Sequence, residues 1–315
     1  MTQEGQRALL RLKAASYRYK SGRRGVAGVT LDVEPGERVV LMGPNGSGKT
    51  TVLGLVTGKL RASSGSVDVL GHSSASLSAG VYRRIGVAAA ETVHVDGLPA
   101  RANAIFFARA AGLSRERAAA EVDRLFDILD LSIVDGHAAP GDYSFGMRRK
   151  LLLVEALAHS PELLLLDEPL LGLDPPARAA LLDHLLSRSK GGATVVAALN
   201  GPADALALAS RVVFLQGGEV VADDTPDALL ARLRKRTCIE IEVEGTESCE
   251  PVYPDGVSVS EVSGTLLATS EFGPGILPAL CQSVLSAGRT IQAVRVKQPD
   301  LGDVFAHLTG EALRT

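Results

Sequence analysis

The octapeptide GPNGSGKT constrains this chain more than any other segment. It runs from Gly43 to Thr50, directly after the apolar run VVLM and directly before a helical pattern that begins TVL. A strand, a glycine-rich loop and a helix in this order form a cradle for phosphate. The glycines let successive backbone N–H groups turn inward, and the helix N-terminus adds positive potential. Lys49 can reach the β- and γ-phosphates, and the Thr50 hydroxyl is placed to ligate Mg²⁺, so the segment predicts a nucleotide site.

We expect this loop and the first helical turn to supply most of the contacts to the nucleotide. The alternative is a glycine-rich turn that binds no nucleotide, but a strand before it and a helix after it favour the phosphate site. The residues expected to bind the nucleotide here are Gly43, Pro44, Asn45, Gly46, Ser47, Gly48, Lys49, Thr50 and Thr51.

Two carboxylates follow a second apolar run, in the segment LLLLDE that ends at Asp167 and Glu168. Four apolar residues in a row are typical of a strand buried on both faces, and its acids emerge at the C-terminal edge, where ligands bind in open α/β sheets. We expect Asp167 to be the Mg²⁺ partner and Glu168 to be the general base that orients the attacking water. The alternative is an acidic pair that only faces solvent.

Length, charge and cysteine usage exclude several other classes. At about 150 residues per domain, 315 residues favour two domains. The 33 Lys and Arg against 36 Asp and Glu give a net charge of −3, so bulk electrostatics does not support nucleic-acid binding. The sequence has no run of eighteen apolar residues and no apolar h-region at its start, and we therefore expect a cytoplasmic chain. Cys238, Cys249 and Cys281 lack CxxC spacing and are expected to be reduced structural thiols.

Charge also divides the chain near residue 237. Residues 237–315 hold 4 basic and 11 acidic residues, a net of −7, and this leaves +4 for residues 1–236. The boundary follows a basic run and precedes IEIEVE, whose alternation predicts a half-exposed strand. Short strand patterns at 257–262, 266–269 and 291–296, with a helical pattern between the last two, predict a small α/β domain over 237–315. Its sequence indicates no chemistry.

The order of the motifs resembles the ATP-binding cassette (ABC) ATPases. Besides GPNGSGKT and LLLLDEP, the chain has YSFGM from Tyr143 before a helix, where the family has its LSGGQ-like signature, and LGLDP from Leu171, where the family has its D-loop. The resemblance implies a head-to-tail dimer with two ATP molecules between the subunits, in which Ser144 and Gly146 act on the partner's ATP. It also implies that Tyr19 stacks on adenine, with Tyr17 as second choice.

Two further segments are similar to the exporter branch of this family. Residues 83–113 have the sequence pattern of that branch, in which a strand and a loop precede a helix of the form AREN-x-x-FFA. The ending PDLGDVFAHLTGEAL is similar to that of bacterial daunorubicin-resistance-type ATPases. The resemblance implies a peripheral subunit on the inner face of the cell membrane that docks on separate integral-membrane permease subunits. It would power export of a lipophilic compound, a polymer or a lipid.

Departures from the family pattern predict slow hydrolysis. Ala90 stands where the family has the Q-loop glutamine, and Glu91 beside it is only a weak substitute because a triphosphate repels a carboxylate. Asn200 stands where the family has the switch histidine, so it can donate a hydrogen bond but cannot become an imidazolium. Phe145 replaces the first signature glycine, and Leu171 replaces the usual D-loop serine. We therefore expect an ATP hydrolase with Glu168 and Asn200 as catalytic residues but with reduced turnover.

Three functions are compatible with these residues. The first, which we favour, is an exporter ATPase subunit that forms a homodimer or pairs with another ABC ATPase subunit. The second is a hydrolysis-deficient, ATP-dependent clamp or regulatory subunit. The third, an ABC enzyme of DNA repair or translation, is disfavoured because the chain has one nucleotide loop and no heptad stretch.

The expected fold is α/β, a P-loop NTPase with a mainly parallel sheet. We expect an antiparallel β subdomain that presents Tyr19 and a helical insertion over 98–149 that brings Ser144 to the dimer interface. The 98–113 segment is expected, by resemblance, to face the membrane partner. The basic cluster Arg148, Arg149 and Lys150 is expected to be a solvated helix face rather than a group that steers phosphate.

Overall fold

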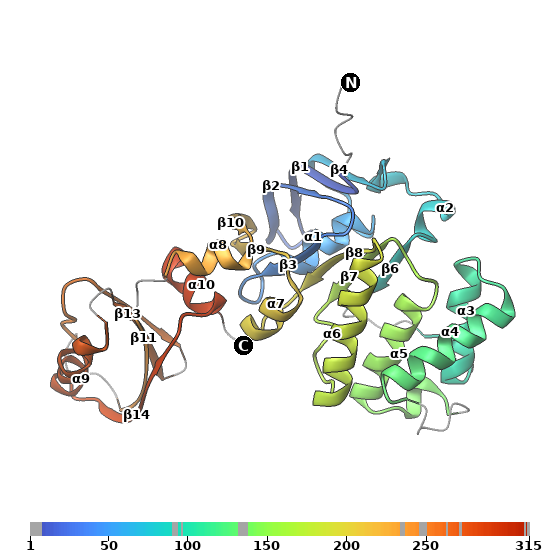
Figure 1. Cartoon of the computed structure of the whole chain (residues 1–315). Helices are drawn as coiled ribbons and strands as arrows, with labels where there is room; N and C mark the ends of the chain where they lie inside the picture. The colour runs from blue at the N-terminus through green and yellow to red at the C-terminus, as the bar shows by residue number, and fades with distance from the viewer. Residues whose placement is uncertain are drawn as a thin grey trace.

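Three β-sheets and the helices around them make up this chain (Figure 1). The computed structural model describes residues 8–89, 94–95, 97–131, 138–233, 237–245, 251–262, 264–270, 273–311 and 313. In this part of the chain, no helix is both long enough and apolar enough to cross a membrane.

The central sheet has six strands in the order β10-β9-β3-β8-β7-β6. All neighbouring strands are parallel except β10, which runs antiparallel to β9 at one edge. Because other elements cover both faces, its inner strands are almost wholly apolar. The strands are β3 (Arg38–Met42), β6 (Ile85–Ala88), β7 (Leu163–Asp167), β8 (Thr194–Ala198), β9 (Arg211–Gln216) and β10 (Glu219–Asp224).

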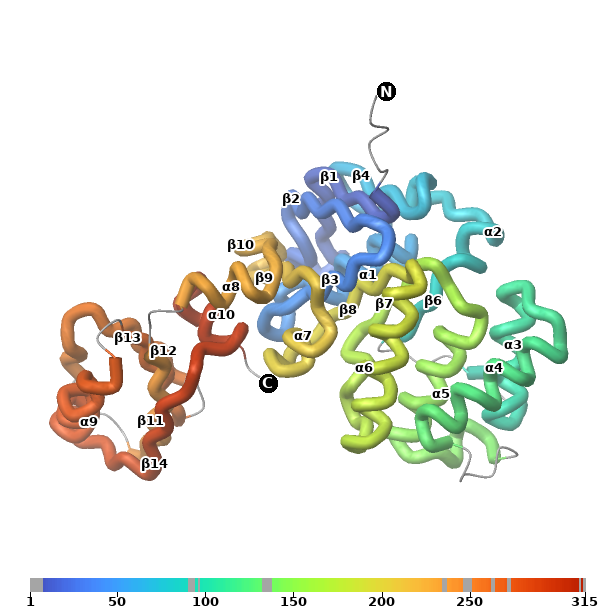
Figure 2. The backbone as a smooth tube through the Cα atoms, in the orientation of Figure 1, coloured from blue at the N-terminus to red at the C-terminus, as the bar shows by residue number. Residues whose placement is uncertain are grey.

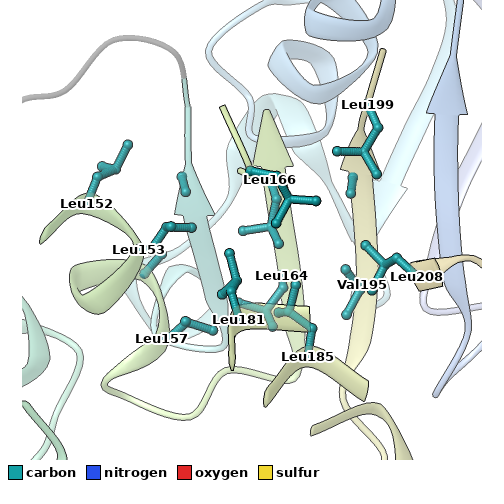
Figure 3. Close-up of a cluster of buried hydrophobic side chains, with 14 of the residues drawn as sticks. Leu152, Leu153, Leu157, Leu164, Leu166, Leu181, Leu185, Val195, Leu199 and Leu208 are labelled. Atoms are coloured by element: carbon teal, nitrogen blue, oxygen red, sulfur yellow. The ribbon is translucent and has the colours of Figure 1, made fainter. Parts of the chain in front are cut away.

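Helices cover one face of this sheet. Alternate residues of β7, Leu164 and Leu166, point into that core, where Figure 3 shows them among leucines of α5, α6 and α7. The resulting stripe of buried leucines places the signature helix α5 in the same core as this face of β7, with its closest packing on the neighbouring strand β6. The helices on this face are α5 (Phe145–Leu157), α6 (Pro175–Lys190), α7 (Pro202–Leu208) and α8 (Pro226–Ala231).

The opposite face carries α1 and a second, antiparallel sheet in the order β2-β1-β4-β5. Leu163 and Leu165 of β7 point into this second core. Tyr19 directly follows the end of β1, which places it over the start of α1. The elements are α1 (Lys49–Val56), β1 (Leu10–Arg18), β2 (Arg24–Val33), β4 (Ser64–Val69) and β5 (His72–Ser73).

A helical subdomain lies beside the central sheet, as Figure 1 shows, and α3 and α4 pack on α5 within it. Side-chain caps fix two of its helix starts. The Ser114 hydroxyl accepts from the Arg117 N–H at the start of α4, and the Ser144 hydroxyl accepts from the Met147 N–H at the start of α5. The bounds of its helices besides α5 are α3 (Ala100–Ala110) and α4 (Arg115–Ile128). The short helix α2 (Ala79–Tyr82) precedes β6.

The third sheet begins at Thr237 and has the order β12-β13-β11-β14, with α9 packed on one face. The last helix, α10, returns to the first part of the chain and packs on α7 and α8, as Figure 2 also shows. There the rings of Phe305 and Phe214 meet edge to face, with centroids 5.4 Å apart. The elements are β11 (Thr237–Glu244), β12 (Val257–Val262), β13 (Thr265–Ser270), α9 (Leu277–Ser286), β14 (Thr290–Lys297) and α10 (Leu301–Thr309).

The predicted fold class is confirmed: an α/β core with a mainly parallel sheet, an antiparallel β subdomain and a helical subdomain. The division into domains at residue 237 stays a prediction. A separate sheet does begin at that point, but Leu301, Val304 and Phe305 of α10 join the core of the first part of the chain.

Candidate nucleotide-binding site

The phosphate loop lies between β3 and α1, as the sequence predicts. Gly48 has φ of +110°, and a Cβ there would lie 2.6 Å from the Gly25 carbonyl oxygen, so only glycine fits. The Lys49 side chain is buried, and its Nζ donates to the carbonyls of Gly43 at 2.6 Å and Pro44 at 3.3 Å. Burial lowers the pKa of Lys49, although the charges of Glu168 and Asp167 oppose this change. A buried ammonium held only by carbonyls is a ready partner for phosphate.

Thr50 and Asp167 meet at the C-terminal end of the central sheet. The Thr50 hydroxyl donates to Asp167 Oδ2 at 2.9 Å, and Asp167 is only 4% exposed. A hydroxyl and a carboxylate are both hard oxygen donors, which suit Mg²⁺ bound together with phosphates. This pair therefore fits the metal site that the sequence predicts.

Glu168 stands at a strained position directly after β7. Its φ is +49°, in the left-handed region that non-glycine residues rarely adopt. Its Oε1 is buried without a hydrogen-bond partner among the described residues. Burial raises the pKa of Glu168, while the positive charge of Lys49 and a main-chain hydrogen bond from Asn200 oppose the increase. A half-buried carboxylate with a raised pKa and an open oxygen is suited to accept a proton.

These groups line one cavity of about 360 Å³. Asn200 Oδ1 and Glu168 Oε1 both belong to side chains on its wall. Neither buried atom has a hydrogen-bond partner among the described residues, so both fit contact with a polar ligand. Ser144 and Gly146, expected to act on a partner's nucleotide, lie outside this wall. The predicted residues that the cavity joins are Tyr19, Asn45, Gly46, Gly48, Lys49, Thr50, Thr51, Asp167, Glu168 and Asn200.

Tyr19, rather than Tyr17, is the tyrosine on the cavity wall. Its hydroxyl shares a 2.9 Å hydrogen bond with the Thr51 hydroxyl, which fixes its ring beside the phosphate loop. Tyr17 packs against the core of the β subdomain and meets the Tyr19 ring edge to face at 4.9 Å. The geometry therefore agrees with Tyr19 as the first choice for stacking on adenine.

Arg23 also lines the cavity, and sequence reasoning missed it. Its guanidinium lies 5.8 Å from the centroid of the Tyr19 ring, within cation–π range. No motif marks Arg23, because the turn between β1 and β2 brings it to the loop. The available signal was that Arg23 lies four residues after Tyr19, which was already expected to contact adenine.

Replacing Arg23 with alanine is expected to weaken ATP binding about fivefold. A cation next to both the Tyr19 ring and the phosphate loop contributes about 1 kcal/mol at such a partly open site. Isothermal titration with ATP and Mg²⁺ measures the change. Arg24→Ala is the matched control, because the neighbouring Arg24 pairs with Glu219 on an exposed surface. Equal loss of affinity in both variants would remove Arg23 from the site.

In the altered signature, the Phe145 ring packs against Gly172 in the D-loop of the same chain. Phe145 is 60% exposed, and a Cβ on Gly172 would lie 2.7 Å from its ring. Gly172 has φ of +76°, so the D-loop backbone passes directly under the ring. Leu171 beside it is 57% exposed. Two large apolar side chains thus face solvent at the surface that the family resemblance assigns to the dimer interface.

The predicted solvated face at residues 148–150 is wrong. Arg149 and Lys150 are each only 6% exposed. Lys150 Nζ pairs with Asp174 Oδ2 at 2.7 Å, and Arg149 donates to main-chain carbonyls. This side of α5 lies against the ends of β6 and β7 and against the D-loop, which supply enough acceptors to bury two cations. Ala90, which stands at the Q-loop glutamine position, and Glu91 lie outside the described residues.

Comparisons with known proteins show the family of this chain. The ABC transporter family model matches residues 26–171. The daunorubicin resistance ATP-binding protein of Streptomyces coeruleorubidus is 32% identical over 295 residues, which are 93% of this chain and 93% of that protein. The Nod factor export ATP-binding protein I of Burkholderia pseudomallei is 31% identical, over 91% of this chain and 93% of that protein.

A solved structure has the same architecture. The structure of an ATP-binding subunit of an ABC transporter matches with a TM-score of 0.66 and 28% identity, covering 71% of this chain and 92% of that chain. Three observations lead to one conclusion. They are this structural match, the cavity that joins the phosphate loop to the two acids, and the relatives that span nearly the whole chain. This chain belongs to the ABC transporter family and is one of its ATP-binding proteins.

Proposed function

We propose that this chain binds ATP with Mg²⁺ and hydrolyses it to drive export through separate membrane subunits. The observation that carries the proposal is the single cavity that joins Lys49, Thr50, Asp167 and Glu168. The names of its relatives support export. They include the daunorubicin resistance and Nod factor export proteins and a fluoroquinolones export ATP-binding protein of Mycobacterium tuberculosis, 32% identical over 97% of this chain and 94% of that protein.

The residues divide the work of hydrolysis among them. Lys49 and the loop N–H groups bind the β- and γ-phosphates, while Thr50 and Asp167 are the groups that would hold Mg²⁺. When bound, the metal neutralises phosphate charge. Glu168 takes a proton from the water that attacks the γ-phosphorus, and the bond from that phosphorus to the β–γ bridging oxygen breaks, leaving ADP and phosphate. Asn200 can donate only a neutral hydrogen bond, so turnover is slow.

The retained geometry of Glu168 argues against the hydrolysis-deficient clamp. A clamp that does not hydrolyse ATP does not require a strained acid on the cavity wall with one oxygen that has no partner among the described residues. The exposed Phe145 and Leu171 support a dimer formed at the signature and the D-loop. Either a second copy or another ABC ATPase subunit fits this surface.

A groove on the helical subdomain supports docking on an integral-membrane subunit and a location on the inner face of the cell membrane. Its cavity of about 920 Å³ lies between α3 and α4, and Leu98, Ile105 and the 48% exposed Phe106 line it. Arg109 and Arg115 at the same groove provide positive charge. Most of this surface, from Leu98 to Ala110, falls within the 98–113 segment expected from the sequence to face the membrane partner.

The test combines phosphate release with transport. We expect the purified chain to release phosphate from ATP and to stop when EDTA removes Mg²⁺. Inverted membrane vesicles from cells that make the chain are expected to take up daunorubicin or a fluoroquinolone with ATP, and to lose this uptake when the chain carries Lys49→Ala. Full uptake by the Lys49→Ala vesicles would show that another subunit drives the pump.

A further inference from the structure

Among the described residues, Arg149 and Lys150 are the most buried cations that the proposed hydrolysis leaves without a role, and Arg149 is the one that bonds to the backbone of Glu168. It lies on α5, five residues after the signature Ser144, and is 6% exposed. Its Nη2 donates to the main-chain oxygens of Asp167 and, at 2.7 Å, of Glu168. Its Nη1 donates to the Ala89 carbonyl at 3.1 Å. One guanidinium therefore joins the signature helix to the ends of β6 and β7.

Two of these acceptors flank the Cα of Glu168. The Asp167 carbonyl belongs to the peptide plane before that Cα, and the Glu168 carbonyl belongs to the plane after it. These two planes define φ and ψ of Glu168. The first plane is also held by the Glu168 N–H, which donates to the Ala198 carbonyl at 3.0 Å. The second is also held by the Leu171 N–H, which donates to the Glu168 carbonyl at 3.1 Å.

A left-handed conformation needs such support. For a residue with a Cβ it is sterically unfavourable, and it persists only where neighbouring groups determine it. Glu168 adopts it at φ of +49°. The direction of the Glu168 side chain follows from this backbone conformation, so the groups that hold the two planes also aim the carboxylate into the cavity.

We propose that Arg149 is a positioning residue for Glu168: by holding both flanking carbonyls it keeps the carboxylate aimed at the attacking water. The inference rests on the proposed hydrolysis and deepens it. Arg149 does not line the nucleotide cavity and acts through Glu168. The same guanidinium bonds to the Ala89 carbonyl, directly after β6. The direction of the Glu168 side chain therefore also depends on the position of the β6 end and of the signature helix α5.

Arg149→Lys and Arg149→Met separate geometry from charge. Lysine keeps the positive charge but loses the planar fork that reaches two carbonyls, and methionine loses both. The charged and polar groups that face Glu168 are Lys49, Asp167, Arg149 and the Asn200 N–H. Both variants lose the bonds to the two carbonyls, so a positioning role predicts that Arg149→Lys loses turnover as Arg149→Met does, although it keeps the charge.

The experiment measures steady-state phosphate release and ATP affinity by titration. We expect kcat to fall about tenfold to a hundredfold in both variants, because small misplacement of a catalytic group costs this much, while the Kd for ATP stays within about threefold. Arg188→Met is the control, since Arg188 also bonds to a main-chain carbonyl, that of Pro161, but in the last turn of α6. Its kcat should not change.

Hydrogen exchange over residues 163–172 adds a measurement that needs no turnover. We expect faster exchange there in both Arg149 variants than in Arg188→Met. A kcat within about twofold of wild type in Arg149→Lys, or a loss of ATP affinity equal to the loss of kcat, overturns the positioning role. A wild-type chain without turnover refutes the proposed hydrolysis instead, and unchanged exchange in Arg149→Lys then overturns this inference separately.

Discussion

Phosphate release by the Glu168→Gln variant is expected to fall by about two to three orders of magnitude. The amide keeps the size and the direction of the side chain, because the backbone at residue 168 is held by its own hydrogen bonds. It cannot accept the proton of the attacking water. ATP affinity should stay within about threefold of wild type, since Lys49 and the phosphate loop supply the binding groups.

Steady-state phosphate release with ATP and Mg²⁺ measures this effect. Glu162→Gln is the matched control, because Glu162 lies just before the same strand but pairs with Arg84 on an exposed surface. That control should retain wild-type turnover. Glu168→Gln turnover within about fivefold of wild type would mean that another group accepts the proton, and the mechanism above would then be wrong.

Local motifs made the centre of the site predictable. GPNGSGKT and LLLLDE each place their polar residues at the end of an apolar strand, and parallel strands bring those ends to one edge of the sheet. The meeting of Thr50 with Asp167 therefore followed from two short segments 117 residues apart. The structure adds the distances and the unpartnered oxygens that the sequence could not contain.

The surroundings of the site were not predictable by the same reasoning. Arg149 and Lys150 were expected in solvent because charged residues on a helix are usually exposed, yet the acceptors of Arg149 are main-chain carbonyls, which leave no signature in a sequence. Arg23 reaches the cavity through a turn. In α10, by contrast, the spacing of Leu301, Val304 and Phe305 places three apolar residues on one face, and this pattern could have indicated a helix that needs a partner.

The position of Phe145 connects the departures of this chain from the family pattern with the slow turnover that we propose. The family resemblance implies that the first signature glycine lets the signature approach a partner's nucleotide closely. Here the ring rests on the backbone of Gly172 and stays exposed, so the side chain remains at the surface where the partner must approach. A partner ATPase subunit with a glycine at this signature position would allow close approach of its signature to the nucleotide bound by this chain. A homodimer would instead carry the Phe145 ring at both nucleotide sites.

The Lys49→Ala variant is expected to lose nearly all stabilisation by ATP. Lys49 Nζ is buried and bonds to two loop carbonyls, so bound phosphate supplies the anion that this ammonium otherwise lacks at short range. We expect ATP binding at least about a hundredfold weaker without it, as for a lost charge-assisted contact in a buried site. ATP at about 100 times the wild-type Kd stabilises the wild type by about 2.7 kcal/mol, but stabilises the variant by only about 0.4 kcal/mol.

Thermal unfolding with and without ATP and Mg²⁺ measures this difference directly. The wild-type melting temperature should rise by about 5 °C, and that of Lys49→Ala should rise by less than about 1 °C. The exposed Lys190 in the last turn of α6 provides the control Lys190→Ala, which should keep the full rise. Without ATP, Lys49→Ala should melt close to wild type, because removing the ammonium also removes its burial penalty. A full ATP-dependent rise in Lys49→Ala would mean that the phosphates bind away from this loop, since an ammonium at their binding site cannot be lost without cost.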